Sequence, residues 1–247
     1  MVILMSKYLK ILPILCALGI IAFSAQKGPE YWRRWEFLRV REFLVVGNQY
    51  LANEVIWEIA SFPVNTSVFD DLARTKLLLE EHEMILEASV KKKWWSRKVV
   101  LTIEEKIPLA LLANALLVPV DRDGNTLPLD PGQHLLDLPL LRVEGDLGER
   151  SEEIRTIALE LERLIASNSF FANELSEISI DGEGNAEAIL NGDIVVRFRP
   201  PLANQTLRAG LTALEDAKKR RLSGVGIMID LRFDGQVVAS YGAEGRQ

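Results

Sequence analysis

The sequence predicts an α+β protein with a single N-terminal transmembrane helix, a small β-α-α-β-β domain and a larger, mostly antiparallel β domain that carries two amphipathic helices. Three observations predict this class. An uncharged apolar run lies between Lys10 and Lys27. Residues 37–108 place apolar side chains at strand spacing, then twice at helical spacing, then twice more at strand spacing. After residue 109 the strand pattern predominates, and two segments of helical periodicity interrupt it.

The N-terminal run predicts a membrane anchor that crosses the bilayer once. Residues 8–26 are expected to form the span, because the long side chain of Lys10 can extend toward the lipid headgroups. Residues 1–7 would then form a short cytoplasmic tail, and residues 27–36 would link the membrane to the first folded domain.

Aromatic side chains follow the run where the outer membrane–water interface would lie, at Tyr31, Trp32 and Trp35. This belt favours a retained anchor. The alternative is a cleaved signal peptide, for which Ala22-Phe23-Ser24 could precede the cut. In either case we expect the bulk of the chain to lie outside the cytoplasm.

The small domain is expected over residues 37–108. A strand over residues 37–46 ends at the turn signal Gly47-Asn48. Asn53 is a candidate N-cap for a first helix, and Asp70-Asp71 would open a second. The second helix should direct one face to the core through Leu72, Ala73 and Leu79. Two half-buried strands should follow, with these inward-facing residues: Leu86, Ala88 and Val90, then Val99, Leu101 and Ile103.

The large domain is expected over residues 109–242, before a tail at residues 243–247. Residues 121–125 and Asn191-Gly192 predict turns between strands. Amphipathic helices are predicted behind Ser151 and around Leu207 to Ala217. An alternating run over residues 227–233, a turn at Asp234-Gly235 and a last strand over residues 236–241 complete the domain.

Composition excludes several classes of function. The net charge of -6 argues against a nucleic-acid partner, and the single cysteine, Cys16, allows neither an internal disulfide nor a thiolate zinc cluster. No motif for nucleophilic, metal-dependent or phosphate-binding catalysis is present, so we expect no enzyme activity, no cofactor and no small-molecule substrate. Asp121 and Asp123 resemble part of a calcium loop, but the remaining ligands are missing and a tight turn is the simpler interpretation.

Residues 91–95, with the sequence Lys-Lys-Lys-Trp-Trp, form the most conspicuous basic and aromatic cluster. One interpretation is a contact with anionic lipid or with a protein partner. The other is a solvated hairpin tip whose tryptophan rings pack partly in the domain core. The regular alternation of the flanking strands favours the second.

Several stretches resemble the FtsQ/DivIB family of cell-division proteins. Val40, Phe43, Val45 and Gly47 match the first strand of that family's POTRA domain. Residues 88–94 and 99–110 match its run A-x-V-x-R-x-W-P followed by V-x-V-x-E-R-x-P-x-A, although Ser96 stands where proline is expected. Residues 120–124 resemble its V-D-x-x-G hairpin. Residues 229–233, Ile-Asp-Leu-Arg-Phe, resemble its closing strand pair.

The resemblance implies a POTRA domain at residues 37–108 and an FtsQ-type β domain at residues 109–242. It implies a non-enzymatic scaffold of the bacterial divisome in the cell inner membrane, concentrated at the division septum. The expected partners are FtsB/FtsL-type proteins, which the scaffold would link to the septal peptidoglycan synthase of FtsI/FtsW type. The first POTRA strand would include Arg39, Val40 and Arg41.

The last strand is the candidate partner site, because it has no successor in sequence and no charge or proline that would block strand pairing. Its residues are Gln236, Val237, Val238, Ala239, Ser240 and Tyr241. Alternation would place Val237, Ala239 and Tyr241 on one face. The alternative role for Tyr241 is to cap the core. Two other functions stay open, a POTRA-bearing adaptor for envelope assembly or secretion and an envelope enzyme with a deep acidic pocket.

Overall fold

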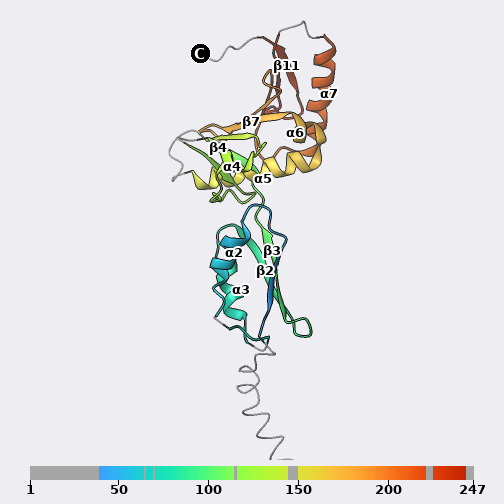
Figure 1. Cartoon of the computed structure of the whole chain (residues 1–247). Coiled ribbons are helices and arrows are strands. Elements are labelled where there is room, and N and C mark those ends of the chain that lie inside the picture. The colour runs from blue at the N-terminus through green and yellow to red at the C-terminus, as the bar shows by residue number, and fades with distance from the viewer. Residues whose placement is uncertain are drawn as a thin grey trace, which may run out of the picture. The chain divides into compact units, whose positions relative to one another are not determined.

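The computed structural model describes residues 39–63, 65–68, 70–113, 116–143, 150–220 and 225–242. These residues form two compact units, one ending at Glu105 and one beginning at Lys106 (Figure 1). Helices and two separate sheets are present, so the predicted α+β class is confirmed. The expected span over residues 8–26 and the interface residues Tyr31, Trp32 and Trp35 lie outside the described residues. Within the described ranges, none of the helices has the length and apolar character needed to cross a membrane.

The first unit has the predicted order of elements. They are β1 (Glu42–Val46), α2 (Asn53–Ala60), α3 (Ala73–Glu80), β2 (Ile85–Lys93) and β3 (Lys98–Glu105). β3 is the central strand, parallel to β1 and antiparallel to β2. The helices pack on one face of this sheet around a core of Ile56, Ala60, Leu72, Leu79, Ile85, Ala88, Val99, Leu101 and Ile103.

Three local predictions in the first unit are wrong. Leu86 is 60% exposed, because a β-bulge leaves it without a partner on β3 and turns Ile85 inward in its place. Asn53 is the first residue of α2 and not its cap, which is Ala52. Ala73 is exposed, whereas Leu72 and Leu79 are buried as predicted.

The loop after β1 is held by one buried carboxylate. Glu105, at the end of β3, accepts hydrogen bonds from the backbone N–H groups of Gln49, Tyr50 and Leu51 at 2.8, 2.7 and 3.0 Å. Three donors that would otherwise lack partners are satisfied by a single side chain. Glu105 is also the acidic residue of the family-like E-K-x-P-x-A run, and this contact gives that residue a structural role.

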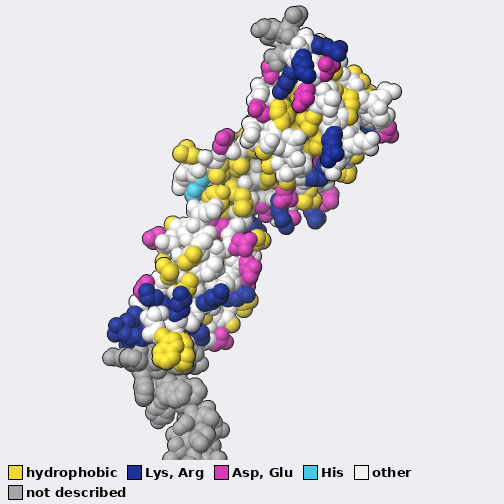
Figure 2. All heavy atoms as spheres, turned by 90° about the vertical axis from the view of Figure 1, so that its right-hand side faces the viewer, with side chains coloured by type: hydrophobic (Ala, Val, Ile, Leu, Met, Phe, Trp, Pro, Cys, Tyr) yellow, Lys and Arg dark blue, Asp and Glu magenta, His cyan; other side chains and the backbone are white. Residues whose placement is uncertain are grey.

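The turn between β2 and β3 differs from the interpretation that the sequence favoured. The rings of Trp94 and Trp95 are 56% and 87% exposed, so they are not packed in the core. Figure 2 shows basic side chains gathered around exposed aromatic rings at the end of the first unit that carries this turn. The burial alternation does not reach the turn along β2, because Lys91, Lys92 and Lys93 are all exposed.

The second unit is one eight-stranded sheet with helices. Its strands are β4 (Ala110–Ala113), β5 (Leu117–Val120), β6 (Leu140–Val143), β7 (Leu175–Ile180), β8 (Ala186–Leu190), β9 (Ile194–Phe198), β10 (Ile227–Asp230) and β11 (Val238–Tyr241). They lie in the order β11-β10-β9-β8-β7-β6-β4-β5. Four of the seven pairings are antiparallel and three are parallel, so the sheet is mixed rather than mostly antiparallel. The helical segments that return the chain to one end of the sheet produce the parallel pairs.

Both predicted amphipathic helices are confirmed, as α5 (Ser151–Ser167) and α7 (Asn204–Arg220). Two shorter helices, α4 (Pro131–His134) and α6 (Ser169–Glu174), were not predicted. The inward residues of α5, α6 and α7 join those of the strands in one core. A buried pair on α5 connects it to the start of α7, because Glu160 accepts from Leu202 N–H at 3.1 Å and Arg163 donates to Asn204 at 2.8 Å.

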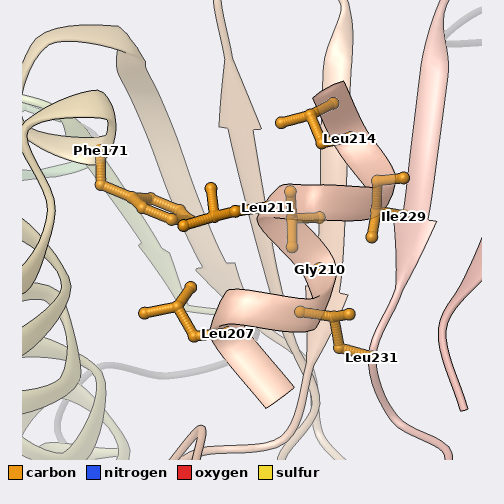
Figure 3. A pocket seen from close by; sticks show the side chains of 8 residues that line it. Phe171, Leu207, Gly210, Leu211, Leu214, Ile229 and Leu231 are labelled. Carbon is orange, nitrogen blue, oxygen red and sulfur yellow. The ribbon is translucent and has the colours of Figure 1, made fainter. Parts of the chain in front are cut away.

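Gly210 brings α7 close to the last part of the sheet. A Cβ at this position would lie 2.9 Å from the Cδ atoms of Leu231, so a larger residue would require the Leu231 side chain or the helix to shift (Figure 3). The side chains of Phe171, Leu207 and Ile229 line the same contact, which encloses about 10 Å³. That volume is about the size of one water molecule's site, so this gap results from packing and is not a ligand pocket.

Candidate partner-binding edge

β11 is an edge strand of the large sheet. Among the described residues it pairs only with β10, through the register Ile227↔Tyr241 to Asp230↔Val238. The predicted turn at Asp234-Gly235 is present, and Gly235 adopts the φ of 69° that it needs. The strands are shorter than expected. β10 ends at Asp230 and not at Phe233, whereas β11 begins at Val238, so Gln236 and Val237 belong to the connection.

The direction of the backbone groups in β11 follows from the bonds of β10. Ile227 N–H donates to Asp193 at 3.0 Å and Leu231 N–H donates to Arg197 at 2.8 Å, so the odd residues of β10 bond toward β9. Met228 and Asp230 therefore bond toward β11, where Ser240 and Val238 are their partners. Gly242 N–H donates to Gly226 O in the same register.

Ala239 and Tyr241 consequently direct their N–H and C=O groups to the open side of β11. Two donors and two acceptors are thus presented to an incoming strand. Val238 N–H points the other way, into the hairpin. A proline at position 238 would therefore remove a hydrogen bond within the hairpin. A proline at position 239 would remove only a donor that points outward.

The two faces of β11 have different surroundings. Ala239 and Tyr241 share the face of Ile227 and Ile229, which α7 covers, and Val237 packs against the core there. Tyr241 is nevertheless 46% exposed, and its hydroxyl makes a long hydrogen bond of 3.4 Å to Ala217 O on α7. The side chain therefore leans on α7 without capping the core. All four residues of β11 are exposed, so the strand keeps an accessible edge.

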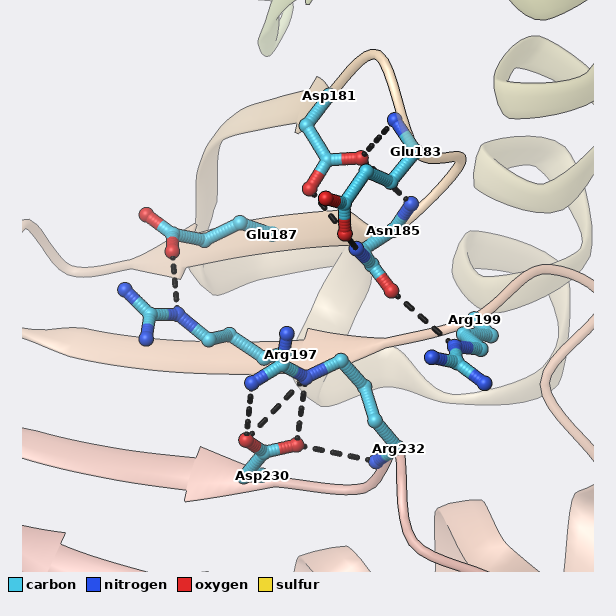
Figure 4. A network of polar contacts seen from close by, with 8 residues as sticks. All are labelled: Asp181, Glu183, Asn185, Glu187, Arg197, Arg199, Asp230 and Arg232. Carbon is cyan, nitrogen blue, oxygen red and sulfur yellow. Dashed lines mark hydrogen bonds and ion pairs between the residues drawn. The ribbon is translucent and has the colours of Figure 1, made fainter.

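A row of charged side chains crosses the opposite face of the sheet next to this edge (Figure 4). Glu187 on β8 faces Arg197 on β9, and their Oε2 and Nε atoms lie 2.7 Å apart. Arg197 faces Asp230 on β10, which in turn faces Val238 on β11. Opposite charges in directly opposed positions stabilise the order of these strands.

Asp230 and Arg232 make a two-pronged ion pair at the end of this row. The Nε and Nη2 atoms of Arg232 lie 3.0 and 2.7 Å from the two carboxylate oxygens. This hydrogen bonding lowers the pKa of Asp230 below its ordinary value, with a smaller contribution from the charge of Arg197, and outweighs the opposing effect of desolvation. Ile229 and Leu231 face the core, so the Ile-Asp-Leu-Arg run alternates core packing with a surface ion pair.

One turn pattern occurs twice in the second unit, at residues 121–125, where a turn was predicted, and at residues 181–185, beside the charged row (Figure 4), where none was. Residues 121–125 and 181–185 share the pattern Asp-x-acid-Gly-Asn and the same bonds. In each turn the aspartate accepts from the backbone N–H groups two and four residues later and from the asparagine side chain. Both oxygens of Asp121 are therefore occupied within its own turn, which favours the turn over the calcium interpretation.

The pKa of Asp181 shows the strength of this arrangement. Desolvation is the largest single influence and raises the pKa, but the hydrogen bonds from Asn185, Glu183 and Gly184 together lower it below its ordinary value. Asn185 also accepts from Arg199 at 3.1 Å, which connects the turn to the end of β9 (Figure 4).

The three residues expected within the first POTRA strand lie just before it, because β1 begins at Glu42. Arg39 forms an isolated bridge with Ser67, and Val40 N–H donates to Thr66 O at 2.9 Å. Arg41 N–H donates to Arg97 O at 2.8 Å, beside the β2–β3 turn. The ladder with β3 itself starts at Glu42.

Among the described residues, no three His, Cys, Asp or Glu side chains are grouped so that they could hold a metal ion. Comparison of the sequence with models of known protein families and with curated proteins gave no match. The open edge of β11 is therefore the candidate functional site.

Proposed function

We propose that the protein is a non-enzymatic divisome scaffold of the FtsQ/DivIB type, with a membrane anchor, a POTRA domain in the first unit and a partner-binding β domain in the second. FtsB/FtsL-type proteins would add a strand to β11, and the scaffold would thereby connect them to a synthase of FtsI/FtsW type at the septum of the inner membrane. The family-like motifs and the β-α-α-β-β order of the first unit support this proposal.

One observation carries the proposal. Ala239 and Tyr241 direct backbone groups outward from an exposed edge strand, and no other described strand pairs with them. Main-chain hydrogen bonds contribute affinity in strand addition, at about 0.5–1.5 kcal/mol each, and neighbouring side chains contribute specificity. Tyr241 is suited to the second role because half of its aromatic side chain remains accessible beside the edge.

The test uses the outward donor of Ala239. Tagged full-length protein is purified from solubilised membranes, and the recovery of FtsB/FtsL-type partners is compared between variants. Ala239→Pro should keep the fold and lose the partners at least about tenfold, which corresponds to about 1.4 kcal/mol. Ala239→Val, which retains the donor and adds similar bulk, should bind like wild type.

Ser240→Pro serves as the contrast, because its N–H bonds to β10 and the hairpin should be disrupted. Circular dichroism separates loss of fold from loss of binding. A folded Ala239→Pro variant that still recovers the partners would place the binding site elsewhere. Recovery of outer-membrane assembly or secretion components instead would favour the adaptor function.

A further inference from the structure

The turn between β2 and β3 presents two exposed tryptophan rings. The rings of Trp94 and Trp95 lie against each other, with centroids 4.8 Å apart. The turn is closed by a bond from Arg97 N–H to Trp94 O at 3.2 Å, and all residues from Lys91 to Ser96 are exposed. The tip therefore exposes a large apolar surface to water, which is unfavourable, and packing within the first unit does not bury it.

Basic residues surround this aromatic pair on both sides. Side chains alternate along β2, so Lys91 and Lys93 project to one face of the hairpin and Lys92 to the other. Lys93 lies directly opposite Lys98, a placement of like charges that weakens strand pairing. Lys98 is paired with Glu42 at 2.6 Å, whereas Lys91 and Lys93 have no acidic partner within the part of the chain that the structure describes.

Charge is segregated along the first unit. Between residues 39 and 105 there are nine Lys and Arg and eleven Asp and Glu, a net charge of -2. Residues 39–41, 91–93 and 97–98 supply seven of the nine basic residues, all near the tip (Figure 2). Residues 80–87 and 104–105 supply six of the eleven acidic residues, at the far end of the hairpin where Ile85 pairs with Glu105.

The chain also reaches the first unit at this basic end. Arg41 N–H donates to Arg97 O at 2.8 Å, so the first described residues of the unit lie beside the turn. The twelve residues from 27 to 38 can reach at most about 40 Å when fully extended. An anchor over residues 8–26 would therefore keep the tip within that distance of the bilayer.

We propose that the β2–β3 tip is a membrane-contact element that docks end-on to an anionic lipid surface. Trp94 and Trp95 enter the interfacial layer, and Lys91 and Lys93 bind lipid phosphates beside them. On the other face Lys92, whose Nζ donates to Asp70 O at 2.7 Å, adds positive charge. Tryptophan favours that layer because its ring is apolar and its N–H is polar, and lysines near an anionic surface are attracted to it. The tip carries positive charge on both faces of the hairpin. A flat membrane surface approached end-on can contact both faces, whereas a protein partner bound to one face would contact only one. The inference rests on the proposed anchor.

The test places a fluorescent probe on the tip of the full-length chain. Cys16→Ser removes the single native cysteine, and Ser96→Cys then carries an environment-sensitive nitrobenzoxadiazole label. The matched control carries the label at Glu83→Cys, an exposed site in the turn between α3 and β2 at the other end of the unit. Both proteins are reconstituted in vesicles of phosphatidylglycerol and phosphatidylcholine and in vesicles of phosphatidylcholine alone.

The Ser96 label should shift its emission to shorter wavelength and be quenched by brominated lipid in the anionic vesicles, and the Glu83 label should not. High salt should reduce the shift, because exposed charges are screened beyond about 10 Å at 0.1 M salt. Lys91→Glu with Lys93→Glu, and separately Trp94→Ser with Trp95→Ser, should abolish it. These side chains are exposed, so the variants should keep the circular dichroism of the parent.

Flotation after alkaline extraction measures the anchor independently. A chain that floats while its Ser96 label stays as polar as the Glu83 label overturns the tip proposal and leaves the anchor intact. A chain that does not float contradicts the anchor, and quenching of its Ser96 label by added vesicles would still support the tip. Absence of both signals overturns both. A label on the tip that responds only when partner proteins are added would identify a protein-binding surface and overturn the lipid proposal.

Discussion

Gly47 is the residue whose identity the fold constrains most tightly. It ends β1 with a φ of 95°, a conformation that residues with a Cβ rarely adopt. A Cβ there would lie 2.3 Å from the carbonyl oxygen of Ile103 on β3. The obstacle is backbone in the centre of the sheet, so no side-chain rotation can relieve it.

Gly47→Ala should therefore lower the free energy of unfolding of the first unit by about 2–4 kcal/mol, since backbone strain and a steric clash add together. Gly192→Ala is the control. Gly192 also has a positive φ, of 75°, but no atom lies within 4 Å of the added Cβ, so the cost should be about 1 kcal/mol. Urea unfolding of residues 39–242 measures both. Equal losses for the two variants would contradict the close approach of Gly47 to β3.

At the scale of elements, β10 connects the covered face of the large sheet to its charged face. Its odd residues pack under α7, and its even residue Asp230 joins the row that begins at Glu187. β10 also supplies the only strand pairing of β11 among the described residues. The stability of the proposed partner-binding edge therefore depends on the interactions that hold β10.

Asp230→Asn should destabilise the protein at neutral pH and progressively less in acid. The pKa of Asp230 is lowered in the folded state, chiefly by the hydrogen bonds from Arg232, so the carboxylate contributes stability above the ordinary aspartate pKa of about 3.9. That contribution is lost as the pH falls through the lowered pKa of the folded state. Urea unfolding across this range should show the difference between wild type and variant shrinking. A difference that stays constant with pH would mean that the pair does not stabilise the fold through its charge.

At the scale of the whole molecule, the chain is two units with separate cores. A basic, aromatic tip occurs in the first and an open strand edge in the second. In the proposed scaffold the tip contacts the lipid surface and the strand edge binds partners. Both uses require that the described residues lie outside the cytoplasm.

Protease added to spheroplasts should therefore digest residues 27–247 and leave a small membrane-bound fragment of the N-terminus. The reason is that the predicted span at residues 8–26 contains the long uncharged apolar run between Lys10 and Lys27. Immunoblotting for tags at each end measures the outcome, with a cytoplasmic protein as the control for intact cells. Complete protection of the C-terminal tag would contradict the topology.

The sequence alone determined the order of elements in the first unit and two helices of the second, because hydrophobic periodicity reports which face of each element is buried. It predicted the β-α-α-β-β order of the first unit, the faces of α5 and α7, and the turns at residues 121–125, Asn191 and Asp234. It also predicted a last strand near the end of the chain. These features depend on neighbours within a few residues, which the sequence shows directly.

Only the tertiary structure decided the features that depend on residues distant in sequence. The bulge at Leu86, the exposure of Trp94 and Trp95 and the mixed direction of the large sheet follow from which strands and helices meet. The row from Glu187 to Asp230 exists because β8, β9 and β10 align in register. The outward direction of the Ala239 and Tyr241 backbone groups is decided by the bonds of β10 to β9. Residues of β10 that bond to β9 cannot bond to β11, so their opposite residues on β11 point outward.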